Sequence, residues 1–506
     1  MKKIFTLLLV AMAAAVVRAT NYIVPVTVVI NGVTSEQMGE FSVEVNDGLY
    51  DINLKNFMLS SENGPMGVGN VELKGIEPYY DGKATLLVTE REVTMTDGDD
   101  PSIEIWMASM LPPVNVVLCG KIEGDLLYMN LNIDLMETLG QLIQVTVGNG
   151  YQMPNPGFEL WHMSDETHVE PKGWHSFESA SGALASLAGH HLTRSENAHS
   201  GEACARIYSS SFFGIVANGT MTTGRLNAGS AIATDPENHA YLDTSLLDID
   251  GGGDPFFVPM YSRPDSVAVW MKFRQGSANP DHPYATISAV ITDGTYYQDP
   301  EDKEYTNVVA RAKNNKIATT NGEWVRVTAP FVYTENSVDP QAVLITISTN
   351  ADAGQGSDGD EVLVDDIQFI YNAKATGLRI KGMDVPGFCP DVMGYEMELD
   401  EEITADDIEV DVEGNTAHVL KAVEIVDGNY LCSVSVLSAD MAEISIYDVI
   451  VKSSATAIRS LQTATSRSAT YFTLDGRQAK TLLPGRIYIC RQADGTVTKV
   501  RLTTNN

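Results

Sequence analysis

The heptapeptide Asn155-Pro156-Gly157-Phe158-Glu159-Leu160-Trp161 opens the part of the chain that decides the fold. Three later pieces belong with it: Gly173-Trp174, His199-Ser200-Gly201 and Val364-Asp365-Asp366-Ile367. Together they predict the opening and the closing of one β-sandwich of roughly two hundred residues, a size that suits a single all-β domain. We expect Glu159 and Asp366 to meet where the first and last strands come together.

Strand patterns between these pieces support the same interpretation. Loops rich in Gly, Asn, Asp and Pro separate them, and few segments have a helical pattern. Residues 151–372 are therefore predicted to form a β-sandwich of the jelly-roll kind. The clearest strands are Ala203–Tyr208, Ser266–Phe273, Ala285–Thr292, Trp324–Phe331, Ala342–Ser348 and Glu361–Tyr371.

The motifs of this segment also resemble a known family. Asn-Pro-Gly-Phe-Glu-x-Trp (155–161), Gly-Trp (173–174), Ala-His-Ser-Gly-x-x-Cys-Ala-Arg-Ile (198–207) and Val-Asp-Asp-Ile (364–367) occur in the order found in the family named "putative carbohydrate metabolism domain". They are similar as well to the wider galactose-binding-like carbohydrate-binding modules. The resemblance implies a carbohydrate-binding jelly roll, in which calcium is often held away from the sugar.

The acidic residues of these motifs are candidate ligands for a structural calcium ion. Calcium takes six to eight oxygens from carboxylates and backbone carbonyls. Glu159 and Asp366 would supply the charges, with Asp365 as a weaker candidate, and carbonyls near Gly157 and His199–Gly201 could complete the shell. The alternative is a hydrogen-bonded carboxylate pair that ties the strand ends together.

Aromatic residues are the candidates for carbohydrate recognition, because sugars stack their C–H faces on aromatic rings while polar side chains bond their hydroxyls. Tryptophans on strands, such as Trp270 and Trp324, are expected in the core. Aromatic pairs in loops are better candidates, because exposed loop aromatics often mark recognition sites. The predicted binding residues are Tyr296, Tyr297, Phe212 and Phe213.

The sequence shows no convincing catalytic centre. Eight of the nine His lie between His162 and His282, but they lack the HxH or HExxH spacing of a zinc site. Acidic residues are plentiful, yet none lies in a recognisable catalytic motif, and there is no nucleophile elbow, phosphate loop or dinucleotide fingerprint. A binding protein is predicted rather than an enzyme, and a glycoside hydrolase is the enzyme class left open.

Residues 20–150 contain short alternating strands joined by turns such as Asp81-Gly82, which predicts a closed antiparallel barrel or a sandwich. Val-Thr-Val-Val-Ile-Asn-Gly-Val (26–33), Leu54–Phe57, Gly67–Val71 and Leu118–Ile122 resemble the calycin-like domain of secreted Bacteroidetes proteins. The resemblance implies a lipocalin-like barrel. Such a barrel can hold a small apolar ligand or be filled by its own side chains.

The two ends of the chain predict export. Residues 1–19 have the features of a signal peptide, with Lys2 and Lys3 before an apolar run. Residues 373–452 look like an immunoglobulin-like spacer. Residues 453–506 are a Ser/Thr/Ala-rich linker followed by a small β-unit, which resembles the C-terminal sorting domains of exported Bacteroidetes proteins and implies attachment to the outer surface.

Charge and cysteine content limit the remaining possibilities. The formal charge of -34 argues against nucleic acid and anionic membranes as partners. No stretch after the signal peptide is long and apolar enough to span a bilayer. Of the five Cys, Cys389 and Cys432 are the best candidates for a disulfide, with isolated thiols as the alternative. We predict a secreted or surface-displayed glycan-binding protein; the alternative is a non-catalytic structural or adhesive surface protein.

Overall fold

The computed structural model describes residues 18–30, 32–59, 66–135, 140–163, 169–187, 189–212, 215–335, 338–414, 417–452, 470–473, 487–491 and 497–501. These residues form strands and three short 3-10 helices, so the predicted all-β fold class is confirmed. Within them, no helix has the length and apolar character needed to cross a membrane. The predicted signal peptide lies outside the described residues up to residue 17, and so does most of the predicted linker and tail.

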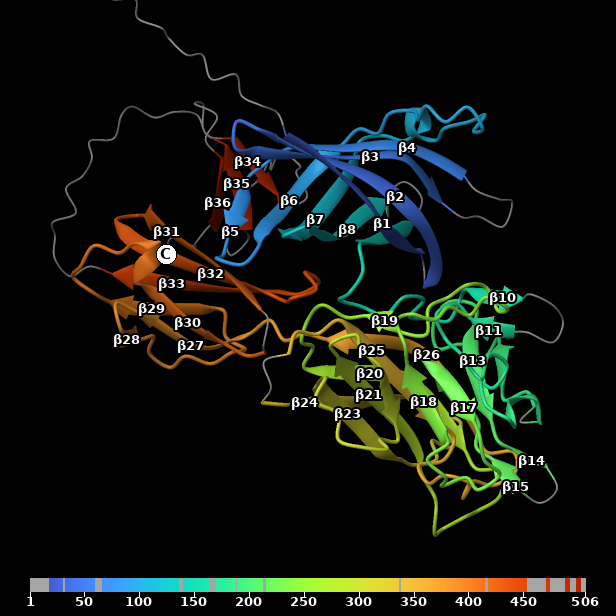
Figure 1. The fold of residues 1–506 in the computed structure, drawn as a ribbon. Coiled ribbons are helices and arrows are strands. Elements are labelled where there is room, and N and C mark those ends of the chain that lie inside the picture. The colour runs from blue at the N-terminus through green and yellow to red at the C-terminus, as the bar shows by residue number, and fades with distance from the viewer. Residues whose placement is uncertain are drawn as a thin grey trace, which may run out of the picture.

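The N-terminal part is one nine-stranded antiparallel sheet that curls into an incompletely closed barrel (Figure 1). Its strand order is β4-β3-β2-β1-β9-β8-β7-β6-β5. At the β2–β3 hairpin, Asp47 and Gly48 both have positive φ, as a tight two-residue turn requires. The strands are β1 (Arg18–Ile30), β2 (Val33–Asn46), β3 (Leu49–Leu59), β4 (Met66–Ile76), β5 (Pro78–Tyr80), β6 (Thr85–Val93), β7 (Val114–Glu123), β8 (Leu126–Leu135) and β9 (Gln141–Val147).

Apolar side chains fill the interior of this barrel. Alternate residues along each strand point inward, and they leave an internal void of only about 20 Å³ beside Phe41, Phe57 and Met129. That volume has room for about one water molecule. Of the two possibilities that the sequence leaves open, the apolar core of the described residues favours the packed barrel.

The central part is a β-sandwich whose strand order is β12-β13-β26-β20-β24-β23-β21-β25-β16, with β19 also paired to β25. Both halves of this order line one core, which includes Val269 from β20 and Ala289 from β21. The strands are β12 (Leu192–Ser195), β13 (Cys204–Tyr208), β16 (Thr220–Thr222), β19 (Val258–Pro259), β20 (Ser266–Arg274), β21 (Ala285–Thr292), β23 (Val308–Ile317), β24 (Val325–Tyr333), β25 (Ala342–Ser348) and β26 (Glu361–Ile370).

Smaller sheets decorate the sandwich. β17 (Arg225–Ala228), β18 (Asn238–Leu242) and β22 (Tyr297–Asp299) form a separate three-stranded sheet. Its inner side chains pack with Val290 of β21 and Leu344 of β25 in a second core. The hairpins β10 (Trp161–Met163) with β11 (Val169–Pro171), and β14 (Ser210–Phe212) with β15 (Ile215–Ala217), complete this part.

The next part has two facing sheets around one core, as the immunoglobulin-like prediction requires. One sheet has the order β28-β27-β30 and the other β29-β33-β32-β31. A further antiparallel sheet, β34-β35-β36, follows near the C-terminus. The strands are β27 (Ala375–Ile380), β28 (Met383–Asp384), β29 (Gly394–Glu398), β30 (Ile408–Val412), β31 (His418–Val426), β32 (Asn429–Leu437), β33 (Ile444–Lys452), β34 (Thr470–Thr473), β35 (Ile487–Arg491) and β36 (Val497–Arg501).

Of the two possibilities for Cys389 and Cys432, the disulfide is wrong and the isolated thiols are confirmed, because both residues are free. Cys432 lies in the middle of β32 and points into the core. Cys389 lies in an exposed loop, where its backbone N–H and carbonyl both bond the Tyr395 hydroxyl. The two side chains therefore belong to different environments of the same sandwich.

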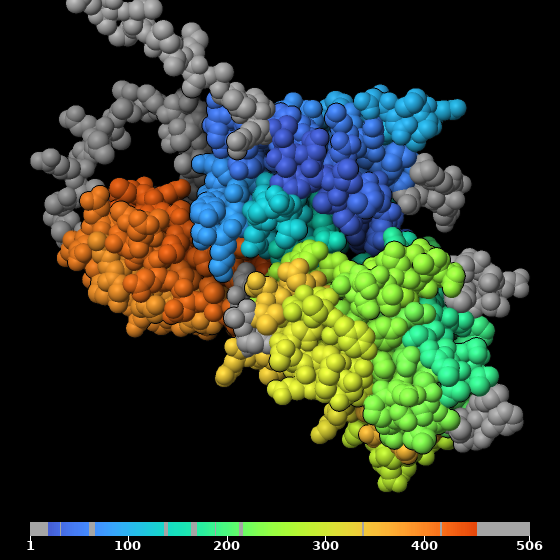
Figure 2. All heavy atoms as spheres, viewed as in Figure 1, coloured from blue at the N-terminus to red at the C-terminus, as the bar shows by residue number. Residues whose placement is uncertain are grey.

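The barrel, the central sandwich and the immunoglobulin-like part contact one another (Figure 2). Lys172 bonds Glu36 of the barrel at 2.7 Å, and Gln152 bonds Asp440 of the immunoglobulin-like part at 2.8 Å. In Figure 1 the sheet containing β17 and β18 lies at the opposite end of the molecule from β29 and β33.

Candidate functional site

The sequence motifs that open and close the sandwich meet in one hydrogen-bonded cluster. The Ile367 N–H donates to the Pro156 carbonyl at 2.9 Å, which joins the two ends. Glu159 Oε1 accepts from the N–H groups of Glu202 and Ala203 at 2.7 and 3.1 Å. Asp365, Asp366 and Glu159 all lie close to Gly157: a Cβ on this glycine would be within 4.0 Å of atoms of all three side chains.

We call Glu159, Asp365, Asp366 and their hydrogen-bond partners the closing cluster. The two aspartates of this cluster also accept hydrogen bonds. Asp365 Oδ2 accepts from the backbone N–H groups of His199 and Ser200, and Asp365 Oδ1 accepts from that of Asp366. Asp366 bonds the Ser200 hydroxyl at 2.8 Å and the His199 ring at 2.6 Å. Burial, and next the charge of Asp366, raise the pKa of Asp365 to about 7.

These hydrogen bonds bear on whether the closing cluster needs a calcium ion. N–H and O–H groups already bond both aspartates and one oxygen of Glu159, so the cluster is held together without a cation. The pattern favours the alternative of hydrogen-bonded carboxylates that tie the strand ends. Calcium bound by Glu159, Asp365 and Asp366 stays a prediction.

The predicted aromatic site is split by the pleat of β22. Tyr296 precedes the strand and is 42% exposed, whereas Tyr297 is 1% exposed in the core. Successive side chains of an extended segment point to opposite faces, so two adjacent tyrosines cannot both face solvent here. The expectation that Tyr297 belongs to an exposed surface is therefore wrong. Phe212 ends β14 but its side chain is not described, and Phe213 lies outside the described residues.

Tyr296 nevertheless has aromatic neighbours. Its ring lies 5.7 Å from that of Tyr241 on β18, and Tyr305 packs against the buried Tyr297 at 5.0 Å. Burial, followed by Tyr241 and two nearby aspartates, raises the pKa of Tyr296. Tyr241 is only 9% exposed, so it mainly supports the Tyr296 ring. We call Tyr241, Tyr296 and Tyr305 the tyrosine surface.

Polar groups surround the tyrosine surface. The Tyr296 hydroxyl donates to Gln298 at 3.1 Å, and the Tyr305 hydroxyl donates to Asp302 at 2.9 Å. Lys303 lies 5.1 Å from the centre of the Tyr305 ring. Glu301, nearby, pairs with Arg311. An apolar ring face bordered by carboxylate, amide and cationic groups is the chemistry that binds a sugar.

Trp270 and Trp324 lie partly exposed rather than in the core. On β20 the core positions are Val267, Val269, Met271 and Phe273, and the alternation of the strand places Trp270 on the outer face. There the His199 ring stacks on Trp270 at 3.9 Å. Lys272 lies 4.9 Å from the Trp324 ring.

A cleft of about 1020 Å³ lies where the three parts meet. Its walls include Asn130 and Gln144 from the barrel, Lys172 and Arg326 from the sandwich, and Asp440 from the immunoglobulin-like part. Ligand sites often form at domain boundaries. Pro156, Gly173 and Asp366 of the sandwich motifs also line this cleft. The sequence alone does not show it, because its other residues come from segments that lie far apart in the chain.

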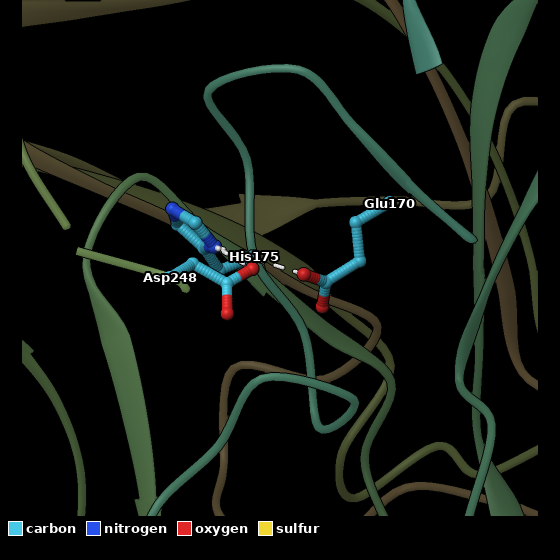
Figure 3. A group of neighbouring side chains, drawn as sticks. All are labelled: Glu170, His175 and Asp248. Atoms are coloured by element: carbon cyan, nitrogen blue, oxygen red, sulfur yellow. Dashed lines mark ion pairs between the residues drawn. The ribbon is translucent and has the colours of Figure 1, made fainter. Parts of the chain in front are cut away.

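Glu170, His175 and Asp248 form a buried group that sequence spacing also misses (Figure 3). His175 Nδ1 lies 3.6 Å from Glu170 Oε2 and 3.8 Å from Asp248 Oδ2. Glu170 is on β11, His175 is in the following loop, and Asp248 comes from a turn more than seventy residues later. The concentration of His in this region is the one signal that points here.

No family model matches the sequence, and no curated protein matches it. Among solved structures, the chain is similar to a putative glycoside hydrolase from Bacteroides thetaiotaomicron, at 16% identity over 58% of this chain and 88% of that chain, with a TM-score of 0.33. It is also similar to a structure of carbohydrate-binding modules from the β-sandwich superfamily, at 10% identity over 65% and 96%, with a TM-score of 0.19. At TM-scores this low, the function proposed below rests on the side chains of this chain.

Proposed function

We propose that this protein is exported and binds glycans through the tyrosine surface. The observation that carries the proposal is the half-exposed Tyr296 ring, which lies beside Tyr241 and is bordered by hydrogen-bonding groups. An aromatic ring with two rotatable bonds gives a sugar a wide apolar face at a small cost in side-chain entropy.

The charge of the molecule indicates which glycans fit. The chain carries a formal charge of -34, and Glu301 and Asp302 lie close to the tyrosine surface. A negative surface repels anionic ligands over the distance set by salt screening. Neutral sugars are therefore the expected ligands, rather than sulfated or uronic acid-rich chains.

The acidic residues near the tyrosine surface have structural partners, which supports binding rather than hydrolysis. Glu301 pairs with Arg311 and accepts the Tyr297 hydroxyl at 3.1 Å. Asp302 accepts the Tyr305 hydroxyl. A glycosidase needs one protonated and one ionised carboxyl group on either side of the scissile bond. These two residues instead support the rings.

The proposal predicts that Tyr296→Ala weakens glycan binding by about fivefold, since losing one stacked ring removes on the order of 1 kcal/mol. The thermal midpoint should stay unchanged because the ring is half exposed. A glycan array of the full chain identifies the ligand, and calorimetry then compares the variants.

Tyr80→Ala is the matched control, because Tyr80 is 74% exposed on the barrel, away from the tyrosine surface. It should bind as wild type does. Equal glycan affinity of Tyr296→Ala and wild type would contradict the assignment of the binding site to the tyrosine surface. A blank array with folded protein would favour the structural or adhesive surface protein instead.

A further inference from the structure

The group formed by Glu170, His175 and Asp248 is almost completely buried. The exposed fractions are 3% for Glu170, 1% for His175 and 8% for Asp248. One ligand atom from each residue lies within 4.8 Å of the others. Two carboxylates are rarely brought this close in a protein interior without a positive charge between them, because the ionised form is destabilised by burial.

Hydrogen bonding orients the His175 ring toward the carboxylates. Its Nε2 lies 3.2 Å from the Pro255 carbonyl, which can only accept, so this nitrogen carries a proton. Nδ1 faces Glu170 and Asp248, with the Ser179 hydroxyl at 3.4 Å. Histidines that bind metals typically donate their other ring N–H to a backbone carbonyl in this way.

Glu170 supplies the second observation. Its Oε1 accepts from the Ser176 N–H and hydroxyl, both at 2.6 Å, and from the Ser179 hydroxyl at 3.2 Å. Its Oε2 is buried and has no hydrogen-bond partner among the described residues. This oxygen is the one that faces His175 Nδ1. A buried carboxylate oxygen without a hydrogen bond is costly unless something else satisfies it.

We propose that Glu170 Oε2, His175 Nδ1 and Asp248 bind a divalent cation of the zinc or manganese class. Two ligands of a tetrahedral ion with bonds of about 2.0–2.1 Å are roughly 3.4 Å apart, so the separations of 3.6 and 3.8 Å need to close by only a few tenths of an ångström. Calcium fits this group less well, because it takes six to eight oxygen ligands rather than an imidazole nitrogen.

The burial of the ligands makes this ion structural. It would join β11 and its following loop to the turn that contains Asp248. That turn leads to Asp254, which bonds the His162 ring at 2.8 Å and the Gly173 N–H at 2.6 Å. Asp254 and Pro255 line the cleft between the three parts. The ion would therefore fix one wall of that cleft, a role that is independent of the tyrosine surface.

The test uses the full chain with any affinity tag removed, stripped with a chelator and then dialysed against Zn²⁺ or Mn²⁺. We expect one equivalent of metal to remain after gel filtration, measured by elemental analysis. In Glu170→Gln and His175→Gln, we expect at least a tenfold loss of affinity in calorimetric titrations with the metal alone.

Asp360→Asn is the matched control, because Asp360 is a fully buried carboxylate of the same sandwich that accepts from the N–H groups of Gly276 and Ser357. It should keep the metal. Asp365→Asn should keep it too, which separates this site from the closing cluster. If a ligand variant does not fold, the absorption spectrum of wild type loaded with Co²⁺ reports nitrogen and oxygen ligation directly.

Two outcomes would overturn the proposal. One is wild-type protein that retains no stoichiometric metal, with nitrogen NMR showing both His175 nitrogens protonated; a proton would then be the positive charge between the carboxylates. The other is unchanged affinity in both folded ligand variants.

Discussion

Asp365 shows how much a single buried carboxyl group can link folding to pH. Its pKa is raised to about 7 by burial and by Asp366, against about 3.9 in an unfolded chain. Between these values the folded state holds a proton that the unfolded state has lost. The contribution of Asp365 to stability therefore falls as pH rises from about 4 to 7, by up to about 1.4 kcal/mol per pH unit.

We therefore predict that the stability of wild type relative to Asp365→Asn declines between pH 5 and pH 8 in the presence of a chelator. Calorimetric melting at the two pH values measures this. If calcium binds the closing cluster, adding it at pH 8 should raise the melting point of wild type. Glu159→Ala should melt lower and should lose that response. Identical wild-type curves with calcium and with chelator would leave the hydrogen-bonded cluster as the whole explanation.

Individual residues also show how much of a site can be predicted from a sequence. The meeting of Glu159, Asp365 and Asp366 follows from motifs that mark the first and last strands, so it could be predicted. The separation of Tyr296 from Tyr297 could not, because it depends on which face of β22 packs on β21 and β25. Asp248 is brought to His175 only by tertiary structure.

Among the elements, the turn before β13 depends on one glycine. Gly201 has φ +64°, and an added Cβ would lie 2.0 Å from Glu159 Oε1 and 2.9 Å from the Gly32 carbonyl of the barrel. Both the backbone conformation and the close packing therefore require glycine. The turn joins three segments that lie far apart in sequence.

We predict that Gly201→Ala destabilises the protein by roughly 3 kcal/mol, the sum of a left-handed backbone and a steric conflict. Gly322→Ala is the control, since Gly322 has φ +86° but nothing within 4 Å of the added carbon. It should cost only about 1 kcal/mol. Denaturant unfolding measures both. Equal losses in the two variants would show that the contact with Glu159 is unimportant.

Strand prediction succeeded where burial was continuous. The predicted bounds of β21 and β25 match the structure, because nearly every residue in them is buried. β23 was missed: its first half is apolar, but its second half, with Lys313, Asn314 and Lys316, is largely open to solvent. Sequence periodicity alone could not show that this polar stretch continues the strand.

For the whole molecule, the barrel and the immunoglobulin-like part are joined by a buried polar chain. His418 Nδ1 bonds Asp81, and Lys121 Nζ lies 3.3 Å from His418 Nε2 and 3.9 Å from the centre of the Tyr151 ring. Burial lowers the pKa of Lys121 to about 8. Burial and then Lys121 lower the pKa of His418 below its ordinary 6.5.

Because the folded state resists protonation of His418, the stability it contributes is fully present above pH 6.5 and is lost as pH falls toward the lowered pKa. We predict that wild type loses stability relative to His418→Gln between pH 7.5 and pH 5. Calorimetry of both proteins measures the difference. Parallel pH profiles of wild type and His418→Gln would contradict the assignment of this effect to His418.

The position of the tyrosine surface affects how far from a point of attachment the protein can bind a ligand. The sheet of β17, β18 and β22 lies at the end of the molecule opposite the immunoglobulin-like part, after which the chain runs on to its C-terminus (Figure 1). If the chain is tethered from its C-terminal side, this sheet lies far from the tether. The parts between the sheet and the tether then set how far from the tether a ligand can be captured.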